Sequence, residues 1–218
     1  DYSGISVSID SDGSHVAIGA NGNGGNGSMA GHVRIYSWDG SAWSQVGNDI
    51  DGEASFDNSG ISVSMDSDGS HVAIGAHLND GAGSSSGHVR IYSWDGSAWG
   101  QVGNDIDGEA ASDNSGTSVS IDSDGSHVAI GAYGNGGNGT ASGHVRIYEY
   151  SSGSWSQVGN DIDGEASFDQ SGFSVSIDSD GSHVAIGANE NDGNGSSSGH
   201  VRLWCPYGIM VIYPDNTI

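Results

Sequence analysis

Carboxylates that alternate beside a glycine are the first feature of this sequence that could do chemistry. They stand in Asn48-Asp49-Ile50-Asp51-Gly52-Glu53, and the motif returns at 104–109 and 160–165. Closely spaced carboxylate oxygens are the ligands that Ca²⁺ takes, although the spacing of an EF-hand loop is absent. Calcium is therefore the candidate cofactor, but the favoured interpretation is a solvated acidic connector or a turn whose Asp side chains cap backbone amides. The predicted ligands are Asp49, Asp51, Glu53, Asp105, Asp107, Glu109, Asp161, Asp163 and Glu165.

Histidine and arginine also stand at recurring places. The first histidine position holds His15, His71, His127 and His183, and the second holds His32, His88, His144 and His200. No H-x-x-x-H spacing joins them, so hydrogen bonding to a neighbouring turn is favoured over metal binding. The only cationic side chains are Arg34, Arg90, Arg146 and Arg202. Among so many carboxylates, each is expected to form a bidentate pair with an Asp, between neighbouring repeats.

Paired aromatic residues flank one turn of the repeat. The pairs are Trp38 with Trp43, Trp94 with Trp99, and Tyr150 with Trp155. Packing of each pair across two neighbouring strands is the favoured interpretation. Stacking on sugar rings, as in a carbohydrate-binding lectin, is the alternative.

Asparagine occurs in N-G-S or N-G-T triplets at one place in a long loop of Gly, Asn and Ser. The triplets begin at Asn26, Asn138 and Asn194. On an exposed loop these triplets are acceptors for N-glycosylation, which predicts a glycoprotein if the source modifies asparagine. The alternative is that a loop of this composition generates the triplet by chance.

These features recur because the chain is a tandem array with a period of 56 residues. The string SGISVSIDSDGSHVAIGA at residues 3–20 returns almost unchanged, which divides a single repeat domain, 1–218, into 1–56, 57–112, 113–168 and 169–218. Within the first repeat, alternating residues and Asp/Gly turns predict four antiparallel strands at 5–9, 15–20, 32–38 and 43–46. No window shows a helical period, so the fold is predicted to be all-β, a β-propeller with one blade per repeat.

The faces of each predicted sheet differ in bulk, and this difference suggests how the sheets stack. The bulky face is predicted to combine Ile5, Val7, Ile9, Val16, Ile18, Val33 and Ile35. The small face is predicted to hold Ser6, Ser8, Ala17 and Gly19. Stacking of bulky against small faces would bury all four sheets in turn.

The repeated string, followed by a Gly/Asn loop and GHVRIY, resembles the FG-GAP repeats of integrin-α-type propellers, in a subtype with SDGS at the first turn. This resemblance covers all four repeats and implies a propeller blade per repeat, extracellular placement and a role in adhesion or binding. The family's propellers have about seven blades, whereas four repeats stand here. Its calcium loop, a longer run of alternating Asp, is replaced by Asp10-Ser11-Asp12-Gly13-Ser14.

The net charge of the chain limits the classes of partner that it can bind. The chain carries 28 acidic residues against four arginines and no lysine, which gives a formal net charge of −24. Nucleic acid and anionic membrane surfaces, which need clustered cations, are excluded as partners. No apolar run approaches the roughly 18–20 residues of a membrane span. Cys205 is the only cysteine, so no disulfide framework exists within one chain, and an extracellular or cell-surface location is expected.

Ser, His and Asp recur as repeat features, so no singular catalytic constellation is expected. We predict a non-enzymatic extracellular module for adhesion, binding or structural assembly, whose partner is a protein or glycan ligand on a surface or another copy of itself. A sugar-binding lectin is the alternative. The divergent segment 205–218 contains the apolar run Ile209, Met210, Val211, Ile212 and Tyr213. That run is predicted to be a strand that completes its own sheet or adds to another molecule as a filament contact.

Overall fold

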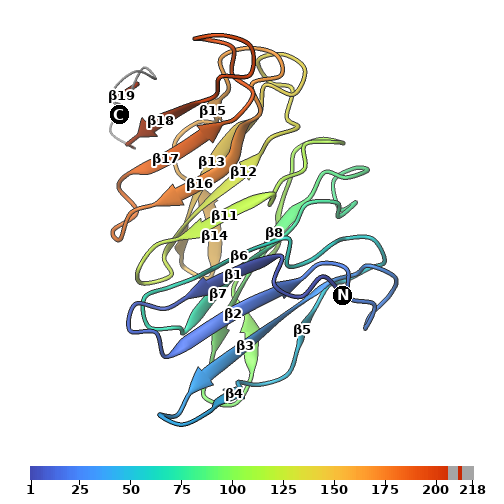
Figure 1. Cartoon of the computed structure of the whole chain (residues 1–218), viewed down its shortest axis with the longest axis vertical. Coiled ribbons are helices and arrows are strands. Elements are labelled where there is room, and N and C mark those ends of the chain that lie inside the picture. The colour runs from blue at the N-terminus through green and yellow to red at the C-terminus, as the bar shows by residue number, and fades with distance from the viewer. Residues whose placement is uncertain (206–210, 213–218) are drawn as a thin grey trace.

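Four antiparallel sheets follow one another along the chain in the computed structural model, which describes residues 1–205 and 211–212 (Figure 1). Sheet 1 contains β1 (Ser6–Ile9), β2 (His15–Ala20), β3 (His32–Trp38), β4 (Trp43–Gln45) and β5 (Ile50–Asp51). Sheet 2 contains β6 (Ser62–Met65), β7 (His71–Ala76), β8 (His88–Trp94), β9 (Trp99–Gln101) and β10 (Ile106–Asp107). Sheet 3 contains β11 (Ser118–Ile121), β12 (His127–Ala132), β13 (His144–Ser151), β14 (Ser154–Gln157) and β15 (Ile162–Asp163). Sheet 4 contains β16 (Ser171–Ile177), β17 (Val184–Ala188), β18 (His200–Trp204) and β19 (Val211–Ile212).

The all-β prediction is confirmed, since every regular element among the described residues is a strand. The four strands predicted for the first repeat agree with β1 to β4 within one residue at each end. The short strand β5 was not predicted, because two residues are too few to show an alternation. Among the residues that the structure describes, no helix could cross a membrane.

The turn between β1 and β2 shows how local chemistry starts a strand. The Asp12 carboxylate accepts a hydrogen bond from the backbone N–H of Ser14 at 2.8 Å, and His15 Nδ1 shares one with Asp10 Oδ2 at 2.8 Å. The first-position histidine of each other repeat pairs with the equivalent Asp of its own repeat, at a distance of 2.7 or 2.8 Å. These four histidines therefore fix a turn, as the structural interpretation predicted.

The register assigns the two faces of each sheet differently from the prediction. Gly19 pairs with Val33 and Ala17 pairs with Ile35, so these two aliphatic residues share a face with the small residues rather than with the other aliphatic ones. The cause is the two-residue period of a strand, which places directly paired residues on the same side of a sheet. We call this side the front face, because it contacts the following sheet, and the opposite side the back face.

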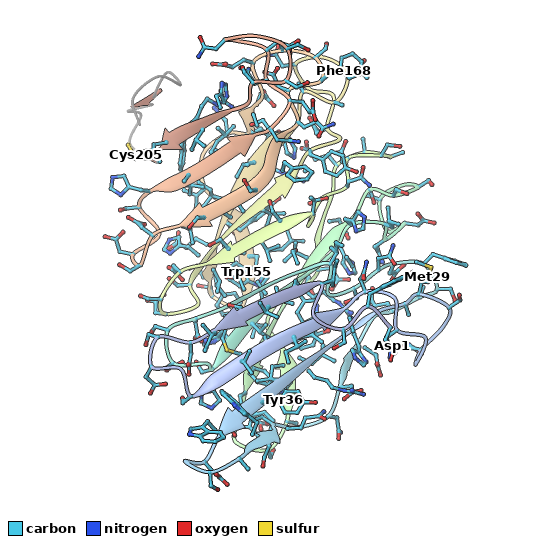
Figure 2. The ribbon with its side chains drawn as sticks, in the orientation of Figure 1. Asp1, Met29, Tyr36, Trp155, Phe168 and Cys205 are labelled. Carbon is cyan, nitrogen blue, oxygen red and sulfur yellow. The ribbon has the colours of Figure 1, made fainter. Side chains whose placement is uncertain are left out.

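Successive sheets pack front to back along the long axis of the molecule, from sheet 1 in blue to sheet 4 in red (Figure 1). Side chains fill the spaces between them (Figure 2). The first of three similar clusters is formed by Ala17, Val33, Ile35 and Ile50 of sheet 1 with Val63, Met65, Val72, Ile74 and Tyr92 of sheet 2. Bulky against small stacking is thus only partly correct, because each front face also supplies aliphatic side chains.

A glycine contact sets how closely the sheets approach. A Cβ placed on Gly75 of β7 would meet the carbonyl oxygen of Gly116, in the next sheet, at 2.0 Å. Gly19 meets Gly60, and Gly131 meets Gly172, in the same way. Because real Cβ atoms do not come this close to backbone, only glycine allows this packing distance.

The strand β19 pairs with β18 of its own sheet, with Leu203 opposite Val211 and Arg202 opposite Ile212. The chain therefore adds this strand to its own fourth sheet, which is the first of the two predicted arrangements. Three residues of the predicted run, Ile209, Met210 and Tyr213, lie outside the described residues.

The glycine contact generates a first prediction. Replacing Gly75 with Ala should lower the free energy of unfolding by about 1–3 kcal/mol, because the methyl group forces sheets 2 and 3 apart. The measurement is urea unfolding followed by circular dichroism. Gly100→Ala on β9 is the matched control, since nothing lies within 4 Å of a Cβ there and its effect should stay within about 0.5 kcal/mol. Equal losses in the two variants would contradict the contact.

Candidate functional site

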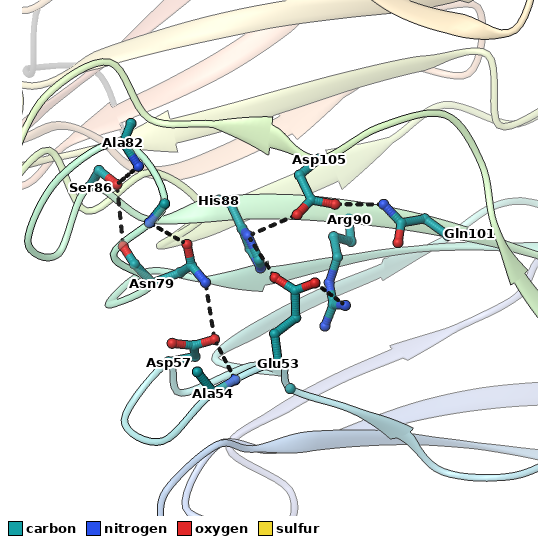
Figure 3. A network of polar contacts seen from close by, with 12 residues as sticks. Glu53, Ala54, Asp57, Asn79, Ala82, Ser86, His88, Arg90, Gln101 and Asp105 are labelled. Carbon is teal, nitrogen blue, oxygen red and sulfur yellow. Dashed lines mark hydrogen bonds and ion pairs between the residues drawn. The ribbon is translucent and has the colours of Figure 1, made fainter. Parts of the chain in front are cut away.

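Side chains from two successive sheets meet in a polar cluster between sheets 1 and 2 (Figure 3). Glu53 comes from the connector that leaves sheet 1, His88 and Arg90 lie on β8, and Asp105 precedes β10. His88 Nδ1 lies 3.9 Å from Glu53 Oε2 and 3.6 Å from Asp105 Oδ2. Gln101 holds Asp105 from the other side with a hydrogen bond of 2.6 Å. The cluster brings a nitrogen donor and two carboxylates to one point.

The same cluster forms between sheets 2 and 3 from Glu109, His144 and Asp161. His144 Nδ1 lies 3.9 Å from Glu109 Oε2 and 3.7 Å from Asp161 Oδ2. The His144 side chain is 1% exposed, and its Nδ1 has no hydrogen-bond partner. Such a buried polar atom carries an uncompensated desolvation cost of about 1–3 kcal/mol, which a bound ligand would relieve.

Burial keeps both histidines neutral. It lowers the pKa of His88 below the usual value of 6.5, and the positive charge of Arg90 lowers it further. The same two causes, burial first and then Arg146, lower the pKa of His144. Burial also raises the pKa of Glu109. A neutral imidazole is the form that binds a metal ion, so these histidines are already in that form at neutral pH.

Each arginine of sheets 2 to 4 contacts the preceding connector. Arg90 donates from Nη2 to the carbonyl oxygen of Asp51 at 3.0 Å, and its Nη1 lies 3.3 Å from Glu53 Oε1. Its guanidinium also lies over the ring of Tyr92, 5.6 Å from the centroid. The predicted bridge between repeats therefore exists at Arg90, but its partners are a glutamate and a backbone carbonyl rather than a bidentate Asp.

Arg34 of sheet 1 alone has the predicted bidentate pair. It donates to Asp49 Oδ1 at 2.9 Å and to Asp49 Oδ2 at 2.8 Å, within its own sheet. These hydrogen bonds are the largest cause that lowers the pKa of Asp49 to about 2. Arg34 thus differs from Arg90, Arg146 and Arg202, each of which donates to a backbone carbonyl in the connector before its own sheet.

The predicted calcium ligands do not gather at one point within a connector. Asp49 and Asp51 lie near His32 of their own sheet, with ligand atoms within 4.8 Å of one another, whereas Glu53 extends to the following sheet. Ile50 between them is buried in the core, which fixes the direction of its neighbours. Calcium binding stays a prediction, and the structure adds the second-position histidines, which we had interpreted as structural, to the candidate ligands.

The aromatic pairs pack across strands, as the favoured interpretation predicted. Their ring centroids are 5.6 Å apart for Trp38 with Trp43 and 5.5 Å for Trp94 with Trp99. Trp99 also donates from Nε1 to the carbonyl oxygen of Val46 in sheet 1 at 2.9 Å, so it joins two sheets. A cavity of about 270 Å³ lies between this indole and the connector 47–51.

The glycosylation triplets lie on loops, and their asparagines are exposed. Asn26 donates from Nδ2 to the carbonyl oxygen of Gly52 at 2.8 Å, and Asn138 donates to that of Gly164 at 2.8 Å. The amide nitrogen that would carry a glycan therefore already binds the connector. Glycosylation at Asn26, Asn138 and Asn194 stays a prediction.

No family model matches this chain, and no curated protein matches it, so the FG-GAP resemblance stays a prediction. Among solved structures, the chain is similar to a protein from Bacteroides uniformis that is provisionally described as a 6-phosphogluconolactonase. The two are 10% identical with a TM-score of 0.57, and the match covers 90% of this chain and 49% of the other. The chain thus spans about half the length of that protein. At this identity the likeness concerns the fold alone, which in that neighbour is a β-propeller.

This neighbour corrects two predictions. We expected a non-enzymatic adhesion, binding or assembly module, with a lectin as the alternative, yet the neighbour is described as an enzyme. We had inferred the absence of a catalytic site from the recurrence of Ser, His and Asp in every repeat, and that premise was wrong. A site built between two sheets can do chemistry at each junction, so repeated residues do not exclude a catalytic arrangement.

The neutral histidines predict a pH dependence of stability. Because the folded pKa of His88 lies below the unfolded value, its contribution to stability is present above pH 6.5 and is lost as the pH falls below that value. The loss of stability caused by His88→Gln should therefore be smaller at pH 5.5 than at pH 8. Urea unfolding of wild type and variant at both pH values measures this difference.

His71→Gln is the matched control, with the opposite sign. A hydrogen bond to Asp66 raises the pKa of His71, so its stabilisation is full below pH 6.5 and is lost as the pH rises through the raised pKa. The loss caused by His71→Gln should be larger at pH 5.5 than at pH 8. The same sign for both variants would contradict the assignment.

Proposed function

We propose that the chain is an arc of β-propeller blades that binds divalent cations of the zinc or manganese type at its Glu–His–Asp clusters between sheets. The observation that carries this proposal is His144 Nδ1, which is buried, has no hydrogen-bond partner and faces Glu109 and Asp161. An acidic cluster alone would be a solvated surface. A neutral nitrogen held unpaired against two carboxylates is what a cation site requires.

The distances support a small cation. Ligand atoms bound tetrahedrally at about 2.0–2.1 Å are about 3.3 Å apart. The distances of 3.7 Å and 3.9 Å from His144 Nδ1 therefore need to shorten by a few tenths of an ångström, which rotation of the partly exposed Asp161 and Glu109 side chains permits. Imidazole with two carboxylates suits zinc or manganese better than calcium, which takes oxygen ligands.

The electrostatic surroundings of the Glu–His–Asp clusters favour the binding of a cation. The formal net charge of −24 raises the local concentration of cations. Arg90 is the one group at the cluster of sheets 1 and 2 that would repel a cation, and it is directed to Glu53 Oε1 and a backbone carbonyl. The second carboxylate oxygen, Glu53 Oε2, faces His88.

Metal titration tests the proposal. Chelator-treated protein should bind two zinc or manganese ions per chain, one at His88 and one at His144, as measured by calorimetry. Its melting temperature should rise, since a cation at 100 times its dissociation constant stabilises the folded state by about 2.7 kcal/mol per site. The paired variant His88→Gln with His144→Gln should lose both effects.

The matched control replaces His71 and His127 with Gln, since these histidines fix turns and belong to neither cluster. It should bind as wild type does. Binding of zinc and manganese that the His88 and His144 changes leave intact would sink the proposal. If calcium alone stabilised the protein, the connector carboxylates rather than the histidine clusters would be the cation ligands.

A second candidate is hydrolysis of an ester or lactone by water on such a cation. Three protein ligands leave a coordination position open, and the neighbour of similar fold is described as a lactonase. Asp105 belongs both to the cluster and to a cavity of about 240 Å³ lined by Tyr148 and Trp155, which could admit a substrate.

Zinc-loaded protein should open a sugar δ-lactone faster than free zinc does, as measured by titration of the released acid. His88→Gln with His144→Gln should abolish the excess rate, and the paired His71 and His127 variant should retain it. An excess rate that survives in the cluster variant, or no excess rate in wild type, excludes this activity.

A further inference from the structure

The two Glu–His–Asp clusters contain the same residue types, but one neighbour of their glutamates differs. The connectors that carry Glu53 and Glu109 have the same sequence, NDIDGEA, at 48–54 and 104–110. The strands β8 and β13, which carry the histidines, both begin with HVRIY. A difference between the two clusters therefore has to come from residues outside these segments.

Both connectors share two backbone anchors around the glutamate. The glycine before it donates its N–H to a glycine carbonyl of its own sheet, as Gly52 does to Gly31 at 2.9 Å. The alanine after it donates its N–H to a buried aspartate, as Ala54 does to Asp57 at 3.0 Å (Figure 3). The second connector has the equivalent bonds at 2.8 Å and 2.9 Å. These anchors engage N–H groups and leave the carbonyl oxygens of the glycine and the glutamate as acceptors for a third contact.

A third anchor, which engages those carbonyl oxygens, distinguishes the first connector. Asn26, on the loop between β2 and β3, donates from Nδ2 to the carbonyl oxygen of Gly52 at 2.8 Å and to that of Glu53 at 3.3 Å. The equivalent residue of the second repeat is Ala82, whose methyl side chain has no donor. The main chain of Glu53 is thus held through its carbonyl groups, and Ala82 cannot hold Glu109 in this way.

The loop that carries Ala82 has the backbone geometry that an asparagine would need there. Ala82 donates its N–H to Ser86 Oγ at 3.2 Å, and Asn138 of the third repeat donates its N–H to Ser142 Oγ at 3.3 Å (Figure 3). Asn138 then donates from Nδ2 to the carbonyl oxygen of Gly164 at 2.8 Å, which is the contact found in the first repeat. The second repeat therefore lacks the side chain for this contact but has the loop conformation.

Cation binding depends on such anchors because the ligands have to close around the ion. The Glu53 side chain is 45% exposed, and its Oε2 lies 3.9 Å from His88 Nδ1, so it has to move toward a shared cation. This movement costs less entropy when the main chain of the glutamate is already fixed. Residues that hold metal ligands in place change metal affinity by about 10–100-fold. Asn26 holds the main chain of the ligand rather than its carboxylate, so the lower end of this range applies.

We propose that Asn26 is a positioning residue of the cluster at His88, and that this cluster binds a divalent cation about tenfold more tightly than the cluster at His144. The inference rests on the proposed cation binding and adds an order of affinity between the two sites.

Calorimetry on single-site variants tests this order. His144→Gln leaves only the His88 cluster, and His88→Gln leaves only the His144 cluster. Zinc should bind the first protein about tenfold more tightly than the second. Adding Asn26→Ala to the first should remove that advantage, and adding Ala82→Asn to the second should raise its affinity by a similar factor. All variants are made in a host that does not glycosylate asparagine, because Ala82→Asn creates an N-G-S triplet.

Asn138→Ala is the matched control for a merely structural role. Asn138 makes the same bonds to the connector before sheet 4 and belongs to neither cluster. Its replacement should lower the free energy of unfolding of the metal-free protein as Asn26→Ala does, and should leave the zinc affinity of the His88 cluster unchanged. Equal zinc affinity of that cluster in the Asn26→Ala and Asn138→Ala proteins would overturn the proposal.

The outcomes separate this inference from the proposed function. If both single-site proteins bind zinc but Asn26→Ala and Ala82→Asn leave the affinities unchanged, the positioning role is refuted and cation binding stands. If Asn26→Ala weakens the His144 cluster as much as the His88 cluster, the change loosens the whole fold and the positioning role is also refuted. If neither single-site protein binds zinc, both proposals fail.

Discussion

The structure depends on the close approach of backbone to backbone at the glycine pairs, such as Gly75 and Gly116. A side chain of any size at these places would separate adjoining sheets. With it absent, the serine hydroxyl beside the glycine reaches the carbonyl of the next sheet, and the aliphatic residues of the front face reach those of the back face. The van der Waals attraction between packed atoms decreases steeply with distance. The apolar cores between sheets therefore require this spacing.

The same spacing creates the polar clusters. Each connector first pairs with its own sheet, as Ile50 does opposite Val33, and its glutamate then extends to the back face of the next. The histidine and arginine that it meets stand on the third strand of that sheet. The two residues are two positions apart on the strand, so both side chains lie on the face that contacts the connector. The cluster therefore exists only where two sheets meet. It is a property of a junction, and no single repeat contains it.

Because the clusters form at the junctions between sheets, the repetition of their residues has a different meaning for function. Similar repeats make similar junctions, and two of them hold a buried histidine with two carboxylates, at His88 and at His144. A repeated site is compatible with cation binding and with catalysis, and a fold alone selects neither. Asp105 illustrates the point, because it belongs to the cluster of one junction and to the cavity of the next.

The sequence alone determined the four longer strands of the first repeat and the turns between them, but not the two-residue strand β5. Alternation over four to seven residues and local Asp–His bonds, such as His15 with Asp10, act within five positions of the chain. It did not determine which face Val33 and Ile35 occupy, because register depends on pairing between strands. Nor could it show that Asp49 and Glu53 serve different sheets, or that Arg90 binds the carbonyl of Asp51, 39 residues earlier. Those contacts arise only when sheets stack, since burial, pKa and partner are then set by residues distant in the chain.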